Sequence, residues 1–274
     1  MIQMNGRHKT VLLFLVAIVF LAAVTVCGWG FSEEAMVTDF SRKDISPGMP
    51  YLFGTDWLGR DMFLRTLTGL SMSIRIGILA AGVSSILALL LGTLAATMGK
   101  TVDGVITWVI DLVMGIPHIL LLILISYAFG KGFKGVVVGV ALTHWTSLAR
   151  VIRGEVLQLK EALYIRTAQK LGVGRWEIAW KHMFPHLFPQ FLVGLILMFP
   201  HAILHEASIT FLGFGLPPEQ PAIGIILSES MKYLAMGRWW LALFPGLFLV
   251  LTVMLFDVAG ENLRKLLDPG SAHK

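Results

Sequence analysis

Residues 150–190 read RVIRGEVLQLKEALYIRTAQKLGVGRWEIAWKHMFPHLFPQ, a basic, amphipathic stretch between two strongly apolar parts of the chain. Its first half carries apolar side chains at helical spacing, namely Ile152, Val156, Leu159 and Leu163. Gly172 and Gly174 are expected to end that helix, because glycine readily adopts the left-handed conformation beyond a helix C-terminus. A second short helix is expected over residues 176–184, ending before Pro185. The stretch therefore predicts helix, glycine turn and helix outside the membrane core.

Two physical interpretations of this stretch remain open at this point. Basic and aromatic residues on an amphipathic helix are typical of a helix that lies among lipid headgroups. A surface on which a cytoplasmic partner docks would have the same composition. Residue chemistry alone does not separate the two.

The composition of the whole chain indicates a membrane protein that crosses the bilayer several times. Of its 274 residues, 56% are hydrophobic and only 14% are charged, whereas soluble domains carry about 25% charged residues. The single cysteine, Cys27, excludes an internal disulfide and is no cysteine-based metal site on its own. The sequence has no G-x-x-x-x-G-K-[ST] loop, so the chain does not bind ATP in that way.

Six apolar segments are predicted to span the membrane: residues 11–29, 72–98, 105–129, 135–148, 191–212 and 240–258. The first follows a basic start, as a signal peptide would. Its apolar run of about 18 residues exceeds the usual signal core of about 7–15, so an uncleaved span is favoured. The fourth segment is short and needs protein neighbours rather than lipid on every side.

The distribution of charge predicts the orientation of these spans. Most of the 22 Lys and Arg residues fall in the segments on the N-terminal side, whereas the opposite segments balance bases with acids. Because cytoplasmic loops are enriched in Lys and Arg, both termini are predicted to be cytoplasmic. The organisation expected is an N-terminal segment and first span (1–31), an extracytoplasmic segment (32–71) and a five-helix core (72–270).

The segment RTAQKLGVGRWEIAWKHMFP, residues 166–185, resembles the EAA loop of ABC importer permeases. That loop has the pattern E-A-A, three residues, G, nine residues, then I-x-L-P, and Ala168, Gly172 and Pro185 match it at the correct spacing. The departures are Arg166 and Thr167 in place of Glu and Ala, and His182 and Phe184 in place of Ile and Leu.

Three more stretches resemble the dipeptide, oligopeptide and nickel permeases of this class. They are FGTDWLGRDMFLRTLTG at 53–69, SITFLGFGLPPEQPAIG at 208–224 and LFDVAGENLRKLLDP at 255–269. The likeness covers about residues 50–270 in the correct order. The chain is therefore identified as a member of this permease family.

The resemblance implies an all-α integral membrane protein with six transmembrane helices, the type I importer permease fold and a cytoplasmic coupling helix. It implies a second homologous permease subunit, two ATP-binding subunits, an extracytoplasmic substrate-binding protein and surrounding lipid, and no nucleic acid. ATP and Mg would bind the partner subunits, so this chain would be no enzyme, with no catalytic residues and no cofactor of its own. Its location would be a bacterial or archaeal cytoplasmic membrane. The ATPase-coupling residues would be Arg166, Thr167, Ala168, Gly172 and Pro185.

His201 and His205 are the most informative polar residues inside the spans. They lie four residues apart, hence on one helix face, and follow Pro200, which is expected to kink the fifth span. Imidazole is a good ligand for Ni, Cu, Zn and Co, so the pair predicts a weak, transient metal site. The alternative is hydrogen bonding between helices with no metal. Glu206, next in sequence, is assigned with the pair to the substrate pathway.

His118 and His144 complete the predicted pathway. His118 follows Pro117, which is expected to kink the third span, and either lines the cavity or bonds a freed carbonyl group. For His144 the alternative is a hydrogen bond to a backbone carbonyl. A membrane metallopeptidase is disfavoured, because no second histidine follows His205-Glu206 in the H-E-x-x-H pattern. A free-standing carrier is disfavoured by the coupling loop.

The histidine pair ahead of the SITFLGFG segment looks like that of the nickel-transport permeases within this family. Dipeptide permeases usually carry small or apolar residues there. The resemblance therefore predicts import of nickel ion or a nickel chelate, with di- or oligopeptide import as the alternative and another chelated metal as a third possibility.

Overall fold

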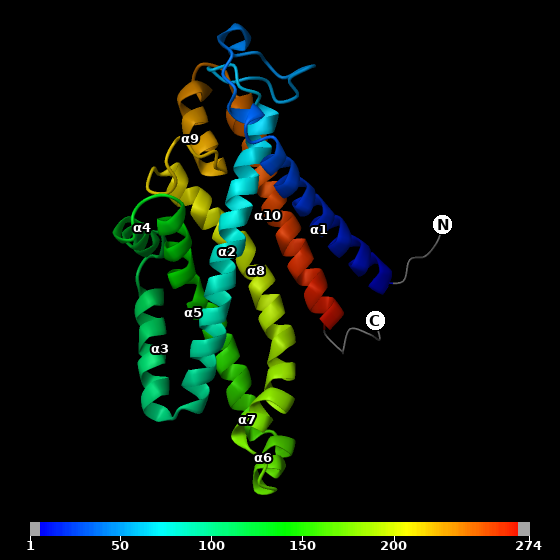
Figure 1. The fold of residues 1–274 in the computed structure, drawn as a ribbon, viewed down its shortest axis with the longest axis vertical. Coiled ribbons are helices and arrows are strands. Elements are labelled where there is room, and N and C mark those ends of the chain that lie inside the picture. Colours follow the sequence, from blue (N-terminus) through cyan, green and yellow to red (C-terminus); the bar gives the residue numbers. More distant parts are fainter. Residues whose placement is uncertain (1–5, 268–274) are drawn as a thin grey trace.

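A computed structural model describes residues 6–267 of the chain, and within them the fold is entirely helical, with a single isolated bridge between Thr55 and Asp61 (Figure 1). The long helices are α1 (Gly6–Gly30), α2 (Met62–Thr97), α3 (Lys100–Gly115), α4 (His118–Ala128), α5 (Phe133–Glu161), α8 (Phe184–Phe211), α9 (Ile223–Leu234) and α10 (Trp240–Leu267). The short ones are α6 (Leu163–Lys170), α7 (Arg175–Ile178), the 3-10 turns Glu34–Met36 and Phe40–Arg42, and the π-helical turn Ala179–Met183.

Five helices in residues 6–267 are long and apolar enough to span a membrane, and the bent pair α3–α4 makes up to six. The predicted all-helical membrane fold is therefore confirmed. The third predicted span, 105–129, is wrong as one helix, because the chain turns by 102° between α3 and α4. The cause is local: Pro117 has no N–H for a helical bond, and Ile116 before it is extended.

The second span begins at Met62 rather than at residue 72. Asp61 caps α2, since its side chain accepts hydrogen bonds from the backbone N–H groups of Phe63 and Leu64 at 2.8 and 3.4 Å. The extracytoplasmic segment predicted over 32–71 therefore includes the first turns of α2, and its limit at the membrane stays a prediction. The outer limits of the other two predicted regions, at residues 1 and 270, and both termini lie outside the described residues.

The fifth span differs from its prediction at Pro185, whereas the kink expected at Pro200 stays a prediction. No helix ends before Pro185. Instead α7, the π-helical turn and α8 form one continuous helical run, and Pro185 lies inside it, as the second residue of α8 directly after the π-helical turn. The helix also continues through Pro189 and Pro200.

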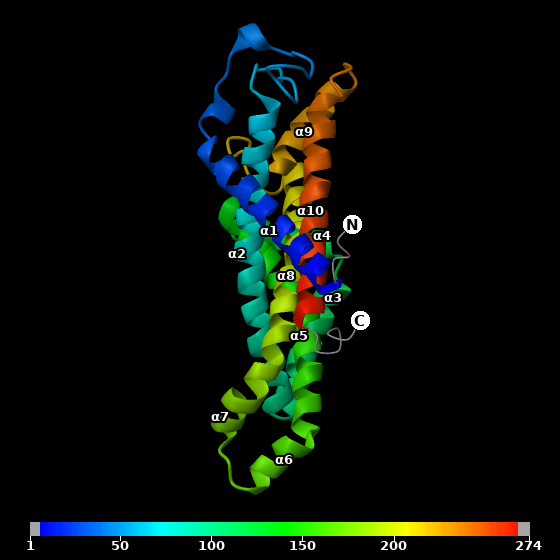
Figure 2. The same cartoon turned by 90° about the vertical axis from the view of Figure 1, so that its right-hand side faces the viewer.

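The molecule is elongated, and its two ends are formed by different segments of the chain (Figures 1 and 2). Helices α6 and α7 occupy one end, whereas residues 31–61 and α9 occupy the other. Helix α2 runs between them and contributes to all three buried apolar clusters, through residues such as Leu70, Ala88 and Ile76. The predicted coupling loop and the predicted extracytoplasmic segment therefore stand at opposite ends of the bundle.

Glycines allow α2 and α5 to approach closely. A Cβ added to Gly92 would stand 2.7 Å from the carbonyl oxygen of Ala149 and 3.2 Å from the Cβ of Ile152. Small residues of this kind are typical of contacts between transmembrane helices, because they bring backbones together. The contact holds α5, and with it the residues that α5 presents, at a fixed distance from α2.

We expect Gly92→Leu to destabilise the protein by about 1–3 kcal/mol, because the added side chain must push α5 away from α2. The thermal midpoint of the detergent-purified protein measures the effect. Gly82→Leu is the matched control, since nothing lies within 4 Å of a Cβ at Gly82 on the same helix. Equal midpoints for the two variants would contradict the prediction.

Candidate functional site

A cavity of about 760 Å³ opens on the side of the bundle between the α3–α4 break, α5 and α8. Its walls are mostly apolar, with histidines, hydroxyl side chains and the backbone of the break among them. The lining residues are Val113, Met114, Gly115, Ile116, Pro117, His118, Thr143, His144, Thr146, Ser147, Leu148, Val151, Gly194, Leu197, Met198, His201 and His205.

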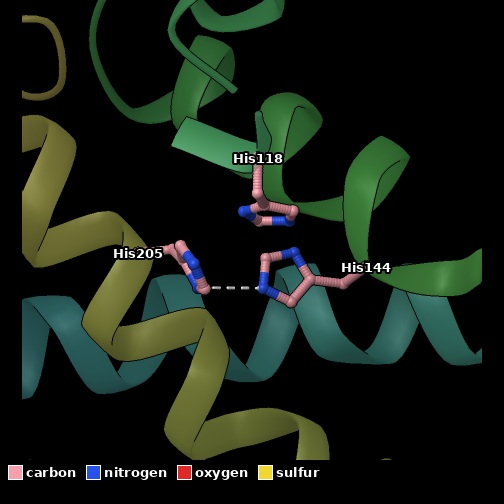
Figure 3. Close-up of side chains that lie close together, drawn as sticks. All are labelled: His118, His144 and His205. Atoms are coloured by element: carbon pink, nitrogen blue, oxygen red, sulfur yellow. Dashed lines mark hydrogen bonds between the residues drawn. The ribbon is translucent and has the colours of Figure 1, made fainter. Parts of the chain in front are cut away.

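Three histidines from three helices meet at the wall of this cavity (Figure 3). His118 begins α4, His144 lies in the middle of α5, and His205 lies in the second half of α8. One ring nitrogen of each lies within 4.8 Å of the others. The ring centroid of His118 is 4.3 Å from that of His205 and 4.7 Å from that of His144. These three residues are called the histidine cluster below.

Backbone carbonyl groups orient two of the rings. His144 Nδ1 lies 3.0 Å from Val140 O, and His205 Nδ1 lies 2.7 Å from His201 O. A carbonyl oxygen only accepts, so each Nδ1 carries the proton and donates it. His144 Nε2, 3.2 Å from His205 Nδ1, is therefore the acceptor in that contact. His144 therefore forms the hydrogen bond to a backbone carbonyl that was predicted as the alternative, and it also lines the cavity.

The proposal that His201 and His205 together bind a metal stays a prediction, and both residues line the cavity. His201 is exposed at the cavity and contributes its backbone carbonyl to His205, while the ring of His205 meets His118 and His144 instead. Spacing along one helix predicted a shared face correctly. It carried no information on which rings from other helices would approach.

Glu206 belongs to the packed interior. It is fully buried, and its Oε1 accepts a hydrogen bond of 2.9 Å from Thr210 Oγ1, one turn further along α8. The cavity wall at this level comes from His201 and His205. The predicted place of Glu206 in the substrate pathway therefore has no support from the geometry.

The predicted coupling residues lie on α6, in the turn that follows it (Gly172) and at the start of α8 (Pro185). Arg166, Thr167 and Ala168 lie on α6, where Arg166 forms an ion pair with Glu161. Gly172 follows α6 with a φ of +80°, and Val173 N–H bonds back to Ala168 O at 3.1 Å. This is the helix end that the glycine predicted, since the left-handed region favours a residue without a side chain.

Large apolar side chains project from this loop into open space. Leu163, Leu171, Trp176 and Trp180 are 80%, 77%, 80% and 63% exposed, respectively. Helices α6 and α7, which carry Leu163 and Trp176, lie at one end of the molecule (Figure 1). An exposed apolar cluster that is surrounded by polar residues marks a contact with another molecule.

A buried ionic network at the opposite end was not anticipated from the sequence. Asp56 Oδ2 accepts hydrogen bonds from Arg60 Nε and Arg65 Nη1, both at 2.7 Å, and Arg65 Nη2 reaches Glu229 Oε2 at 2.9 Å. Trp57 stacks on Tyr233 beside it, with ring centroids 4.4 Å apart. Three of the charged residues lie in the segment 53–69, but the fourth, Glu229, lies on α9, 164 residues after Arg65, so the sequence did not indicate that they meet.

Two ion pairs fix the α3 arm that borders the cavity. Arg153 of α5 binds Asp103 through two nitrogens, one at 2.6 Å, and Arg150 pairs with Asp111. These pairs hold α3 against the C-terminal half of α5.

The family of the chain follows from comparison with known proteins. The model of the binding-protein-dependent transport system inner membrane component matches residues 88–273. The dipeptide transport system permease protein of Bacillus subtilis (strain 168) is 30% identical over 96% of this chain and 82% of its own length. The oligopeptide transport system permease protein of the same organism is 32% identical, over 96% and 86%. The probable D,D-dipeptide transport system permease protein of Escherichia coli (strain K12) is 27% identical, over 99% and 91%.

A solved structure shares the fold. An inward-facing form of the MetNI methionine ABC transporter superposes with a TM-score of 0.63 at 16% identity, over 76% of this chain and 98% of that one. The helical arrangement is thus the type I ABC importer permease fold. Because the family model and relatives at 30% identity or more span most of the sequence, the chain belongs to the family of binding-protein-dependent transport system inner membrane components and is a multi-pass transmembrane permease subunit of an ABC importer, not itself an enzyme.

Proposed function

We propose that this permease subunit imports di- or oligopeptides. The observation that carries the proposal is the likeness, over nearly the whole chain, to relatives named as dipeptide and oligopeptide permeases. This reverses the order of the two substrates expected from the histidine pair, because the overall likeness favours peptides over nickel. A cavity of about 760 Å³ is within the usual range of small-molecule sites, about 300–1,000 Å³.

Nickel, free or chelated, remains the second candidate because of the histidine cluster. Dipeptide recognition does not call for three converging imidazoles, whereas borderline metal ions bind imidazole well. The cluster lies at the wall of the same cavity, so either cargo would pass along the same route.

We also propose that α6 and the glycine turn form the contact with an ATP-binding subunit. An ABC importer permease works with ATPase and substrate-binding subunits. The exposed apolar residues of the loop offer a docking surface at the tip of the bundle, which supports docking over the headgroup alternative. This end would then be cytoplasmic and residues 31–61 extracytoplasmic, with both termini on the cytoplasmic side. A second permease subunit would complete the pathway, and the partners would hold ATP and Mg.

Uptake in cells that carry the whole complex tests the substrate. Labelled dipeptide and labelled nickel are compared in cells with this chain and in cells lacking it. We expect dipeptide uptake that requires this chain and metabolic energy. Loss of nickel uptake with no change in dipeptide uptake on removal of the chain would overturn the peptide proposal in favour of nickel.

A further inference from the structure

We infer that His118, His144 and His205 form a binding site for a divalent first-row transition-metal ion in the wall of the import cavity. The inference rests on the proposed function only in taking the cavity to be the import route, and it adds a metal to the cargo that the route accepts. It differs from the pairing of His201 with His205 that sequence spacing suggested.

The hydrogen bonds already present prepare two of the rings as ligands. Metal-binding histidines commonly donate the other ring N–H to a backbone carbonyl, which fixes both the tautomer and the ring orientation. His144 does so toward Val140 O and His205 toward His201 O. Each ring therefore carries its lone pair on Nε2, and a metal would displace the N–H of His205 Nδ1, which lies 3.2 Å from His144 Nε2.

The third ring supplies an independent observation. Within residues 6–267, His118 Nδ1 is buried and has no hydrogen-bond partner. A buried polar atom without a partner costs free energy unless a ligand satisfies it, so its occurrence indicates a site that is completed by binding. His118 is the first residue of α4, directly after the bend at Pro117. Its ring lies close to those of His144 and His205 (Figure 3).

The distances require only a small closure. Ring nitrogens bound to one Zn²⁺-like ion at about 2.0–2.1 Å stand roughly 3–3.5 Å from each other. One ring nitrogen of each histidine in the cluster lies within 4.8 Å of the others. Metal binding requires His205 to turn its Nε2, in place of the protonated Nδ1, toward His144 Nε2, and requires the three rings to close on one point.

The ligand set selects the class of ion. Three neutral imidazoles suit Ni²⁺, Co²⁺, Cu²⁺ and Zn²⁺, whereas Mg²⁺ and Ca²⁺ prefer oxygen ligands. The cluster borders the open cavity, so the remaining coordination positions of the ion face space for water or for a small chelating molecule. Three protein ligands with open positions give a site that a cargo can leave, as transport requires.

The metal site is tested by direct binding to the assembled complex, purified through a tag on this chain. Equilibrium dialysis with Ni²⁺ alone, and with Ni²⁺ premixed with an excess of a dipeptide, separates a bare ion from a chelated one. We expect one ion per copy of this chain above the background of the triple variant His118→Ala, His144→Ala, His205→Ala. Each single alanine variant removes a ligand and should weaken binding by more than the roughly 10–100-fold that loss of an outer-shell partner costs.

His205→Gln and His8→Ala are the matched variants. Glutamine retains a hydrogen-bonding side chain on α8 but no imidazole, so it should assemble normally and bind Ni²⁺ as weakly as His205→Ala. His8, on α1, should be replaceable without effect on Ni²⁺ binding. Size-exclusion chromatography verifies assembly in each case. Full Ni²⁺ binding by assembled His205→Gln would overturn the inference and leave a packing role for the cluster.

A second readout does not depend on any variant. Co²⁺ bound to several imidazoles absorbs visible light differently from hydrated Co²⁺, so the wild-type complex should develop these bands on addition of Co²⁺. Their absence would also overturn the inference. Neither result bears on peptide import, which is judged separately by labelled dipeptide uptake; the metal site and the peptide proposal therefore fail on different measurements.

Discussion

Replacing Asp56 with alanine is expected to prevent the folded permease from accumulating. The carboxylate is 0% exposed and neutralises Arg60 and Arg65, whose side chains are 8% and 3% exposed. Its removal leaves two buried guanidinium groups with only Glu229 nearby, at 3.8 and 2.9 Å. Loss of one partner from a buried ionic group costs about 3–5 kcal/mol, a large share of the roughly 5–15 kcal/mol that stabilises a typical protein.

The amount of protein in the membrane and its thermal midpoint in detergent measure this loss. Asp56→Asn is the informative companion, because an amide preserves the oxygen that accepts from Arg65 but removes the charge, so its midpoint should fall between wild type and Asp56→Ala. Asp39→Ala is the surface control: Asp39 pairs with Arg42 at 2.9 Å where both side chains contact solvent, and such pairs contribute little. The prediction fails if Asp56→Ala and Asp39→Ala have the same midpoint.

Replacing Gly172 with tryptophan is expected to abolish uptake while ATP hydrolysis by the partner subunits becomes independent of transport. The expected defect lies in the contact with the ATP-binding subunit and not in the folding of this chain. Nothing lies within 4 Å of a Cβ placed on Gly172, so the indole would project into the surface where the ATP-binding subunit is proposed to dock. Closure of the ATPases would then no longer move α6 as a rigid body.

The control for Gly172→Trp addresses its backbone. Because φ is +80° at this position, any side chain adds strain, and asparagine tolerates that region better than most residues. Gly172→Asn should therefore retain much of the uptake. If α6 lay among lipid headgroups instead, tryptophan would be well accommodated there. Intact assembly and uptake in Gly172→Trp would accordingly contradict the coupling proposal.

Local chemistry was enough to predict the all-helical membrane fold and the end of α6 at Gly172, whereas the coupling role of this loop stays a prediction. A transmembrane helix satisfies its backbone hydrogen bonds within itself, so an apolar run of sufficient length specifies a span without reference to other segments. The glycine turn at Gly172 and the site of the bend at Pro117 could be predicted, because both depend on the backbone of one or two residues, but the size of that bend could not. The start of the second span at Met62 was missed, since the cap at Asp61 lies in a segment whose composition is mixed.

The sequence by itself thus determined a helical, membrane-spanning permease with a helix, glycine turn and helix between its fourth and fifth apolar segments. The tertiary structure decided which polar groups meet. It placed His205 with His118 and His144 rather than with His201, and it joined Asp56 to Glu229 through Arg65. The physical reason is that spacing along one helix fixes only which residues share a face. Which faces come into contact depends on close packing between helices and on the 102° turn at Pro117, and these are properties of the whole bundle.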